Sequence, residues 1–122
     1  MKRVVILLAH GSRDPQWRLP IERLCRALRA RLYGVRVAPA YLENMRPDLE
    51  SQVGMLAERG YRDQTIVPVF VGSGRHLKRD LARKVKTLGR RHRDVRLKVQ
   101  RAIGERREVI AAIAAAIATG VK

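Results

Sequence analysis

The stretch from Val4 to Arg13 is VVILLAHGSR, a run of apolar residues that ends abruptly at the turn His10-Gly11-Ser12. A short apolar run that stops in a turn of small residues is typical of a buried parallel strand. In open α/β sheets, ligands bind outside the carboxyl ends of such strands. The sequence therefore predicts a strand over residues 3–9 that presents His10 at a ligand-binding edge.

A second histidine also follows a predicted strand, in a turn of small residues. The apolar run 64–71 is followed by Gly-Ser-Gly-Arg-His, which puts His76 near the start of the next predicted helix. Pro68 inside this run is hard to accommodate, because a central strand loses a ladder hydrogen bond at a proline unless the strand bulges or ends there. The working hypothesis is that the fold brings these two imidazoles together.

Four apolar runs alternate with four stretches of helical periodicity. Two further strands are expected over 35–42 and 95–99, and Pro39 indicates that the first of these is an edge strand. The alternation favours one α/β domain over residues 1–122, a three-layer sandwich with a four-stranded parallel sheet. With the flavodoxin-like strand order 2-1-3-4, His10, His76 and Glu43 would all lie on one edge.

The helical stretches differ in how clearly they begin and what they bury. Asp14-Pro15 resembles a capped helix start, but Pro20 would break a helix that began there. The last helix is expected over residues 105–118, with its larger apolar side chains buried against the sheet. These side chains are Val109, Ile110, Ile113 and Ile117.

The composition is strongly basic. The 122 residues carry 27 Lys and Arg against 11 Asp and Glu, a net charge of +16, which implies an anionic partner. Residues 75–101 hold much of this excess and contain no aromatic residue, which argues against base stacking on single strands. No window is long and apolar enough to span a bilayer. The single cysteine, Cys25, excludes an internal disulfide and fits the reducing cytoplasm.

Two imidazoles and a carboxylate form a ligand set suited to divalent cobalt, nickel, iron or zinc. Imidazole also titrates near neutral pH, so either histidine could accept a proton. His10, His76 and Glu43 are therefore the candidate catalytic residues, and the two histidines are the candidate metal ligands. The sequence does not identify which of these metals is bound.

Each candidate also has an ordinary structural interpretation. His10 could be a turn residue bonded to the backbone, and Glu43 a solvated loop acid. The run Gly72-Ser73-Gly74 could cradle a phosphate at a helix N-terminus, although it lacks the Gly-Lys-Ser/Thr ending of a P-loop. His92, among arginines, is interpreted as a surface residue. Ser12 lacks the surroundings of a serine-hydrolase nucleophile.

At these residues the sequence resembles the short form of the sirohydrochlorin chelatases, the CbiX-type cobaltochelatases. The similarity is carried by three segments, which are Leu7-Leu8-Ala9-His10-Gly11-Ser12-Arg13-Asp14-Pro15, Ala40-Tyr41-Leu42-Glu43, and Val67-Pro68-Val69-Phe70-Val71-Gly72-Ser73-Gly74-Arg75-His76. The family also carries a Pro-apolar-Phe sequence in the third strand, which answers the objection raised by Pro68.

The resemblance implies a chelatase-type flavodoxin-like fold and a function. Such enzymes insert a divalent metal into sirohydrochlorin without a nucleotide, release two protons, and act as homodimers in their short form. By motif match, His10 and His76 would bind the metal and accept protons, with Glu43 as an acidic residue nearby. The tetrapyrrole, which bears eight carboxylates, would meet Ser12, Arg13, Gly72, Ser73, Gly74, Arg75 and Lys78.

Three departures from the family pattern and two other functions remain. The chain has Asp80-Leu81-Ala82 where the family usually has Asp-Ile-Pro, and Pro20 falls where the family normally has uninterrupted helix. Its charge is also higher than the family leads one to expect. The alternative function is nucleic-acid binding through the basic face of residues 75–101. A histidine phosphatase would need an arginine directly before His10, and the chain has Ala9 there.

Overall fold

The computed structural model describes residues 2–122 and contains a four-stranded parallel sheet. The strands are β1 (Lys2–Ala9), β2 (Val35–Tyr41), β3 (Tyr61–Pro68) and β4 (Arg96–Val99). Their order is β2-β1-β3-β4, which confirms the predicted order and the α/β class. β2 is an edge strand, so Pro39 lies where the missing N–H costs least, as its presence predicted.

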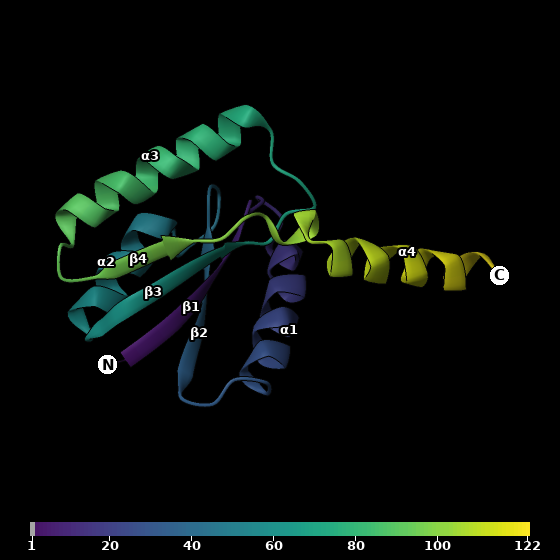
Figure 1. Cartoon of the computed structure of the whole chain (residues 1–122), viewed down its shortest axis with the longest axis horizontal. Coiled ribbons are helices and arrows are strands. Elements are labelled where there is room, and N and C mark those ends of the chain that lie inside the picture. The colour runs from purple at the N-terminus through teal and green to yellow at the C-terminus, as the bar shows by residue number, and fades with distance from the viewer. Residues whose placement is uncertain (1) are drawn as a thin grey trace.

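Helices cover both faces of the sheet (Figure 1). They are α1 (Arg18–Arg29), α2 (Leu49–Glu58), α3 (Arg75–Arg91) and α4 (Arg107–Val121), with short 3-10 turns at Pro15–Trp17 (η1) and Ile103–Glu105 (η2). α1 packs on β1 and β2, whereas the opposite face is covered by α2, against β2 and β3, and by α3, against β4. No helix within residues 2–122 is both long and apolar enough to cross a membrane.

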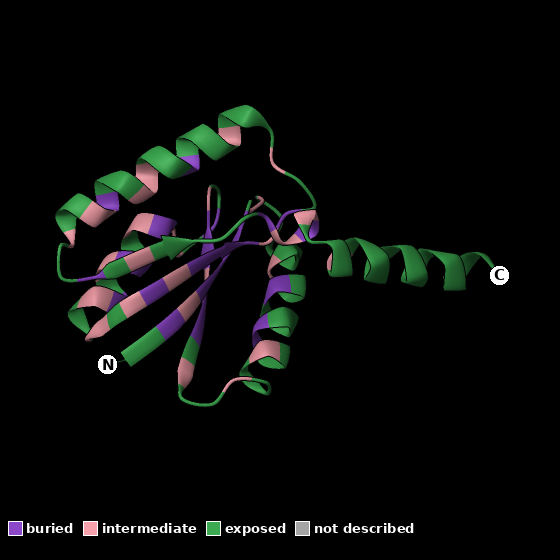
Figure 2. Cartoon of the chain, viewed as in Figure 1, coloured by how far each residue is buried: buried purple, intermediate pink, exposed green. Residues whose placement is uncertain are grey.

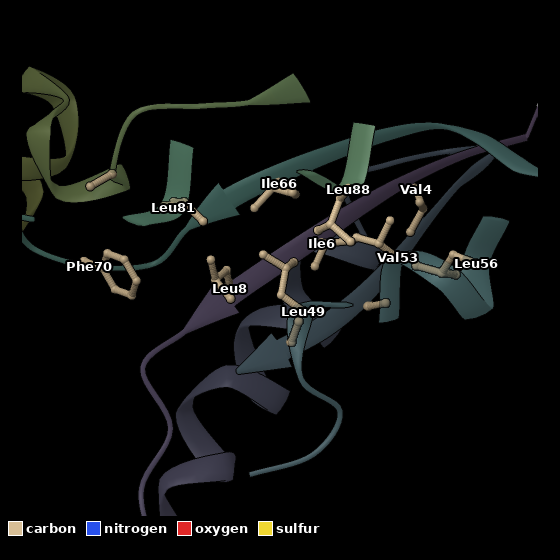
Figure 3. Packing of buried hydrophobic residues seen from close by; sticks show 13 residues of the cluster. Val4, Ile6, Leu8, Leu49, Val53, Leu56, Ile66, Phe70, Leu81 and Leu88 are labelled. Atoms are coloured by element: carbon tan, nitrogen blue, oxygen red, sulfur yellow. The ribbon is translucent and has the colours of Figure 1, made fainter. Parts of the chain in front are cut away.

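Each face of the sheet has its own hydrophobic core. On one face, Ile6, Leu8 and Ile66 of the strands are fully buried beneath α2 and α3, as Figure 3 shows. On the other face, Leu7 and Val37 pack against Ile21 and Cys25 of α1. Alternate residues of β1 thus enter different cores, which explains why its sequence is apolar at nearly every position.

Three prolines mark boundaries of elements. Pro68 is the last residue of β3, so the strand ends before the missing N–H is needed. Asp14 caps the short η1 turn by accepting a hydrogen bond from the Gln16 N–H at 3.0 Å, and Pro15 is the first residue of that turn. Because α1 begins only at Arg18, Pro20 lies in its first turn, where a backbone N–H has no helical partner anyway.

The prediction for the last helix is wrong in one respect. α4 forms close to where periodicity placed it, but none of its residues is buried (Figure 2). Ile110, Ile113 and Ile117 are 49%, 39% and 62% exposed. Periodicity shows that one side of a helix is apolar, but it does not identify the surface that the helix meets.

Candidate functional site

The candidate site lies at the carboxyl edge of the sheet, where β1 and β2 end. His10 follows β1 directly and is exposed, and its ring lies 4.7 Å from the ring of Phe70, centroid to centroid. Phe70 itself is buried in the core between the sheet and α3. The imidazole therefore has one side supported by an ordered aromatic ring while its polar edge meets solvent.

Backbone contacts join the two strand ends. The Glu43 N–H donates to the carbonyl oxygen of His10 at 3.0 Å, and the Leu42 N–H donates to that of Ala9 at 2.9 Å. Gly11 has a φ of +91° and lies so close to Glu43 that a Cβ would overlap the Glu43 carbonyl oxygen. The His-Gly sequence therefore permits a backbone approach that other residues would obstruct.

A cavity of about 220 Å³ opens at this edge. His10 and Glu43 line one side, and α3 supplies the other side with the polar residues Asp80 and Lys84 and the apolar residues Leu77 and Leu81; Leu42 completes the lining. Lys84 also forms an ion pair with Glu50 of α2 at 3.2 Å. The structure thus brings together two of the three predicted catalytic residues, His10 and Glu43.

His76 lies beside this cavity rather than in it. It is the second residue of α3, is exposed, and precedes Asp80 by four residues. Residues four apart occupy neighbouring places on one side of a helix, so His76 lies one turn from Asp80 on the flank of the cavity. Within residues 2–122, no three His, Cys, Asp or Glu side chains are grouped closely enough to hold a metal ion.

Asp80 and Lys84 were not singled out as site residues from the sequence, although a signal was available. Both follow His76 at successive intervals of four residues, which places them on a common side of α3. What the sequence lacked was the rotation of α3 about its axis, which decides whether that side faces the sheet edge.

The loop between β3 and α3 contains most of the remaining predicted binding residues. Gly74 is the N-cap of α3 and contributes no side chain, and Gly72, Gly74 and Arg75 are exposed. In the first loop, Arg13 is exposed, and the Ser12 hydroxyl oxygen accepts a hydrogen bond from the Asp14 N–H at 3.1 Å. These residues therefore surround the edge without forming a closed pocket.

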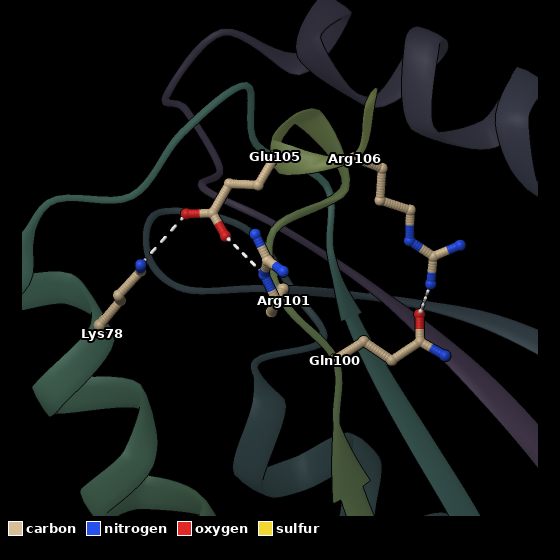
Figure 4. A network of polar contacts seen from close by, with 5 residues as sticks. All are labelled: Lys78, Gln100, Arg101, Glu105 and Arg106. Atoms are coloured by element: carbon tan, nitrogen blue, oxygen red, sulfur yellow. Dashed lines mark hydrogen bonds and ion pairs between the residues drawn. The ribbon is translucent and has the colours of Figure 1, made fainter. Parts of the chain in front are cut away.

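Lys78 faces a different cavity, of about 350 Å³, between α3 and β4. Its ammonium group lies 3.2 Å from the carboxylate of Glu105, which also meets Arg101 at 3.4 Å (Figure 4). The hydrogen bond from Lys78 is the main cause that lowers the pKa of Glu105. Ser73 lines the same cavity.

Comparisons with known proteins match this chain to the CbiX family and to sirohydrochlorin chelatases. A family model described as CbiX matches residues 4–119. A sirohydrochlorin cobaltochelatase of Methanopyrus kandleri is 32% identical over 77 residues, which make up 63% of this chain and 54% of that protein. The matched segment thus spans about half the length of that relative.

Two solved structures have the same fold. A putative cobalamin (vitamin B12) biosynthesis CbiX protein from Marinobacter aquaeolei aligns with a TM-score of 0.85 and 29% identity over 98% of this chain and 97% of that one. The sirohydrochlorin chelatase SirB from Bacillus subtilis subspecies spizizenii, in complex with cobalt, aligns with a TM-score of 0.82 and 20% identity. That alignment covers 98% of this chain but 51% of SirB.

Proposed function

This chain belongs to the CbiX family, and on that premise we propose that it inserts a divalent metal ion into sirohydrochlorin. The observation that carries the proposal is the cavity that His10 and Glu43 share with Asp80 at the carboxyl edge of the sheet. Imidazole and carboxylate groups together suit divalent cobalt, nickel or iron. Cobalt is the first candidate, because it is the metal in the name of the Methanopyrus kandleri relative.

The chemistry requires a metal donor site and two proton acceptors. A divalent ion replaces two pyrrole N–H protons, so charge balances without a redox step and without a nucleotide. His10, supported by Phe70, would hold the incoming metal through a neutral ring nitrogen and then accept a proton. His76 would serve as the second metal ligand and proton acceptor from the flank of α3. Glu43 and Asp80 would attract the cation before transfer.

The substrate would lie across the sheet edge. A cavity of about 220 Å³ accommodates a metal ion and its ligands but not a whole tetrapyrrole. The carboxylates of sirohydrochlorin would meet Arg13, Arg75 and Lys78 through charge-assisted hydrogen bonds. Ser12 and the segment Gly72-Ser73-Gly74 would contact the macrocycle, because small residues let it approach the backbone closely.

A site that is open on one side favours a homodimer. SirB is about twice as long as this chain, and a second copy would supply a comparable amount of protein over the exposed substrate. We place this metal chelatase, a lyase by reaction type, in the reducing cytoplasm, where Cys25 stays a free thiol. The metallated product would then serve cobalamin, sirohaem or F430 synthesis according to the metal inserted.

The test is metal insertion into sirohydrochlorin, followed by absorbance against a reaction without protein. We expect Co²⁺ insertion to be accelerated, and Ni²⁺ and Fe²⁺ assayed in parallel to rank the metals. His10→Ala and His76→Ala should each remove most of the acceleration. His92→Ala is the matched control, because His92 lies at the other end of α3 near Gly54 and should leave the rate unchanged. If no metal is inserted faster than in buffer, the proposal is wrong.

Nucleic-acid binding is the second candidate, and the exposed side of α3 is the observation that favours it. Arg75, Arg79, Arg83, Lys86 and Arg90 are all exposed along this helix. Binding to duplex DNA or RNA that weakens steeply with salt, and that ignores His10→Ala and His76→Ala, would support this function instead of catalysis.

A further inference from the structure

A cavity of about 430 Å³, which we call the α1 cavity, lies on the face of the sheet that α1 covers. It opens between α1 and the edge strand β2, which run side by side in Figure 1. Its lining residues are Arg18, Glu22, Cys25, Arg26, Arg29, Pro39 and Tyr41. None of them lines the cavity of His10 and Glu43, so the α1 cavity is a separate place on the molecule.

The sequence gathers three arginines on the side of α1 that faces this cavity. Arg18, Arg26 and Arg29 are separated by eight and by three residues, and both intervals return a side chain to nearly the same side of a helix. Glu22 is the one acidic residue in the lining. Three guanidinium groups against one carboxylate leave two positive charges in excess, so the cavity attracts an anion.

Two of the guanidinium groups are held in place and keep donors for a ligand. Arg18 donates to the Arg46 carbonyl oxygen at 2.8 Å, and Arg29 donates to the Val37 carbonyl oxygen at 3.0 Å. Within residues 2–122, none of the three arginines forms an ion pair with a carboxylate. Because a guanidinium group has five N–H donors, most of them stay available to an anion in the cavity.

The Tyr41 hydroxyl is a further donor at the cavity. Tyr41 is only 1% exposed, and the Arg18 guanidinium lies 5.5 Å from the centre of its ring. No hydrogen bond in the described part of the chain reaches this hydroxyl. Burial raises the pKa of Tyr41, so the group keeps its proton at neutral pH. A buried hydroxyl without a partner is costly, and an acceptor in the cavity would remove that cost.

This set of donors suits a dianionic phosphate group. A carboxylate offers two oxygens and one negative charge, whereas a phosphate monoester offers three oxygens and up to two charges, which match the excess in the cavity. Arginine also pairs with phosphate through two parallel hydrogen bonds. Each phosphodiester of a nucleic acid carries a single charge and leaves half of that excess unbalanced.

The cavity is larger than a phosphate group needs. Its volume falls in the range of small-molecule sites, which are roughly 300–1,000 Å³. Pro39, the Tyr41 ring and the Cys25 side chain give it an apolar wall, and burial raises the pKa of the Cys25 thiol, which keeps that group neutral. The ligand therefore has an organic part that meets this wall as well as a phosphate group that meets the arginines.

We propose that the α1 cavity binds a small phosphate monoester, with Arg18, Arg26 and Arg29 around the phosphate and the Tyr41 hydroxyl donating to one of its oxygens. Glu22 faces the same group and weakens the binding. The inference does not depend on metal insertion, because the two cavities lie on different faces of the sheet and share no residue.

The test is a titration at constant ionic strength followed by the amide signals in ¹H–¹⁵N NMR spectra, which report both the place and the strength of binding. Ribose 5-phosphate should shift signals of α1 and β2 with a dissociation constant below about 10 mM. Inorganic phosphate should bind at the same place more weakly, because it does not meet the apolar wall. Acetate should bind at least about tenfold more weakly than inorganic phosphate.

Four variants test the roles of the side chains. Arg26→Gln should raise the dissociation constant for ribose 5-phosphate at least about tenfold. Arg23→Gln is the matched control, since it removes the same charge from α1 outside the lining, and it should change the constant less than about twofold. Tyr41→Phe keeps the ring and should weaken binding roughly tenfold. Glu22→Gln should strengthen it. Thermal unfolding checks that each variant folds.

Several results would overturn the inference. Absence of shifts in α1 and β2 is one, and equal losses in Arg23→Gln and Arg26→Gln, which would indicate unspecific attraction to a basic protein, are another. Tyr41→Phe that binds like the unaltered chain would reject the site as described. Equal affinity for inorganic phosphate and ribose 5-phosphate would assign the cavity to the free ion only. Shifts confined to residues 72–76 and lost in Arg75→Gln would assign the phosphate to the other edge.

Discussion

Gly11 and Glu43 meet backbone to backbone at the end of β1. Gly11 has a φ of +91°, and a Cβ on it would overlap the carbonyl oxygen of Glu43. The Glu43 N–H in turn donates to the His10 carbonyl oxygen. The position of Glu43 relative to His10 is thus set by the main chain and depends on glycine at residue 11.

Gly11→Ala should therefore lower the free energy of unfolding more than an ordinary glycine substitution does. The left-handed backbone conformation alone costs about 1–2 kcal/mol for a residue with a Cβ. The overlap with Glu43 adds to this, so we expect a loss of about 3 kcal/mol or more. Urea unfolding followed by circular dichroism measures it.

Gly60→Ala is the matched control. Gly60 has a φ of +90°, but the nearest atom to its Cβ position is Lys2 Cδ at 3.8 Å, an ordinary contact. This variant isolates the cost of the backbone conformation. If both variants lose the same free energy of unfolding, the loop that contains Glu43 moves aside at no cost. The main chain would then not fix the distance between Glu43 and His10.

The arrangement of the sheet could be predicted from the sequence because each clue was local. Apolar runs that end in turns defined the strands, and Pro39 identified the edge strand. The exposure of α4 could not be predicted in this way. The periodicity of Ile110, Ile113 and Ile117 is the same whether the helix packs on its own domain or on another molecule. Gly104, which precedes α4, lies so close to the backbone of Val71 that a Cβ would overlap it, and such a contact between segments far apart in the sequence is not visible in the periodicity.

The site could be predicted only as far as strand ends determine it. His10 and Glu43 follow adjacent parallel strands, so their proximity follows from topology. The position of His76 depends on how α3 is rotated about its axis after the glycine-rich loop, and the sequence does not fix that rotation. The same rotation places Asp80 and Lys84 in the cavity and turns Lys78 toward β4.

The N-cap of α2 should make stability depend on acid pH. The Asp48 carboxylate accepts a hydrogen bond from the Ser51 N–H at 2.8 Å, and hydrogen bonding to Ser51 lowers the pKa of Asp48. A lowered pKa in the folded state means that the unfolded chain binds the proton more tightly. This stabilisation is therefore complete above the ordinary pKa of about 3.9 and is lost as the pH falls through the lower folded value.

Asp48→Ala should accordingly cost about 1 kcal/mol at pH 7, with a smaller difference from the unaltered chain near pH 2. Asp48→Asn, which keeps an oxygen acceptor but carries no charge, should recover only part of the loss at pH 7 and should remove the pH dependence. Urea unfolding at pH 2 and at pH 7 measures these differences in the free energy of unfolding. A deficit in Asp48→Ala that is the same at pH 2 and pH 7 would show that the carboxylate charge contributes nothing to the cap.

Cys25 should be unreactive in the folded protein. Cys25 is 2% exposed on the side of α1 that packs on the sheet, and burial raises the pKa of its thiol although Arg29 opposes the shift. Because the thiolate is the nucleophile, a disulfide reagent at pH 8 should label Cys25 at least about 100-fold more slowly than in denaturant. The control is Cys25→Ala combined with Ala27→Cys, which exposes a thiol on the same helix. Rapid labelling of native Cys25 would show that α1 opens readily from the sheet.

Arg75 and Lys78 should contribute unequally to substrate binding. Both lie in the first turn of α3, but the Lys78 ammonium group already meets the Glu105 carboxylate at 3.2 Å. A substrate carboxylate would have to compete with Glu105 for it, whereas Arg75 is exposed at the edge. We expect Arg75→Ala to raise KM for sirohydrochlorin several-fold more than Lys78→Ala does, with little change in kcat, because the lost contact is the same in the ground and transition states. Glu105→Gln removes the competitor while keeping the side-chain shape, so it should lower KM in the unaltered chain but not in Lys78→Ala. A Glu105→Gln effect that persists without Lys78 would instead implicate Arg101, the other cation on that carboxylate.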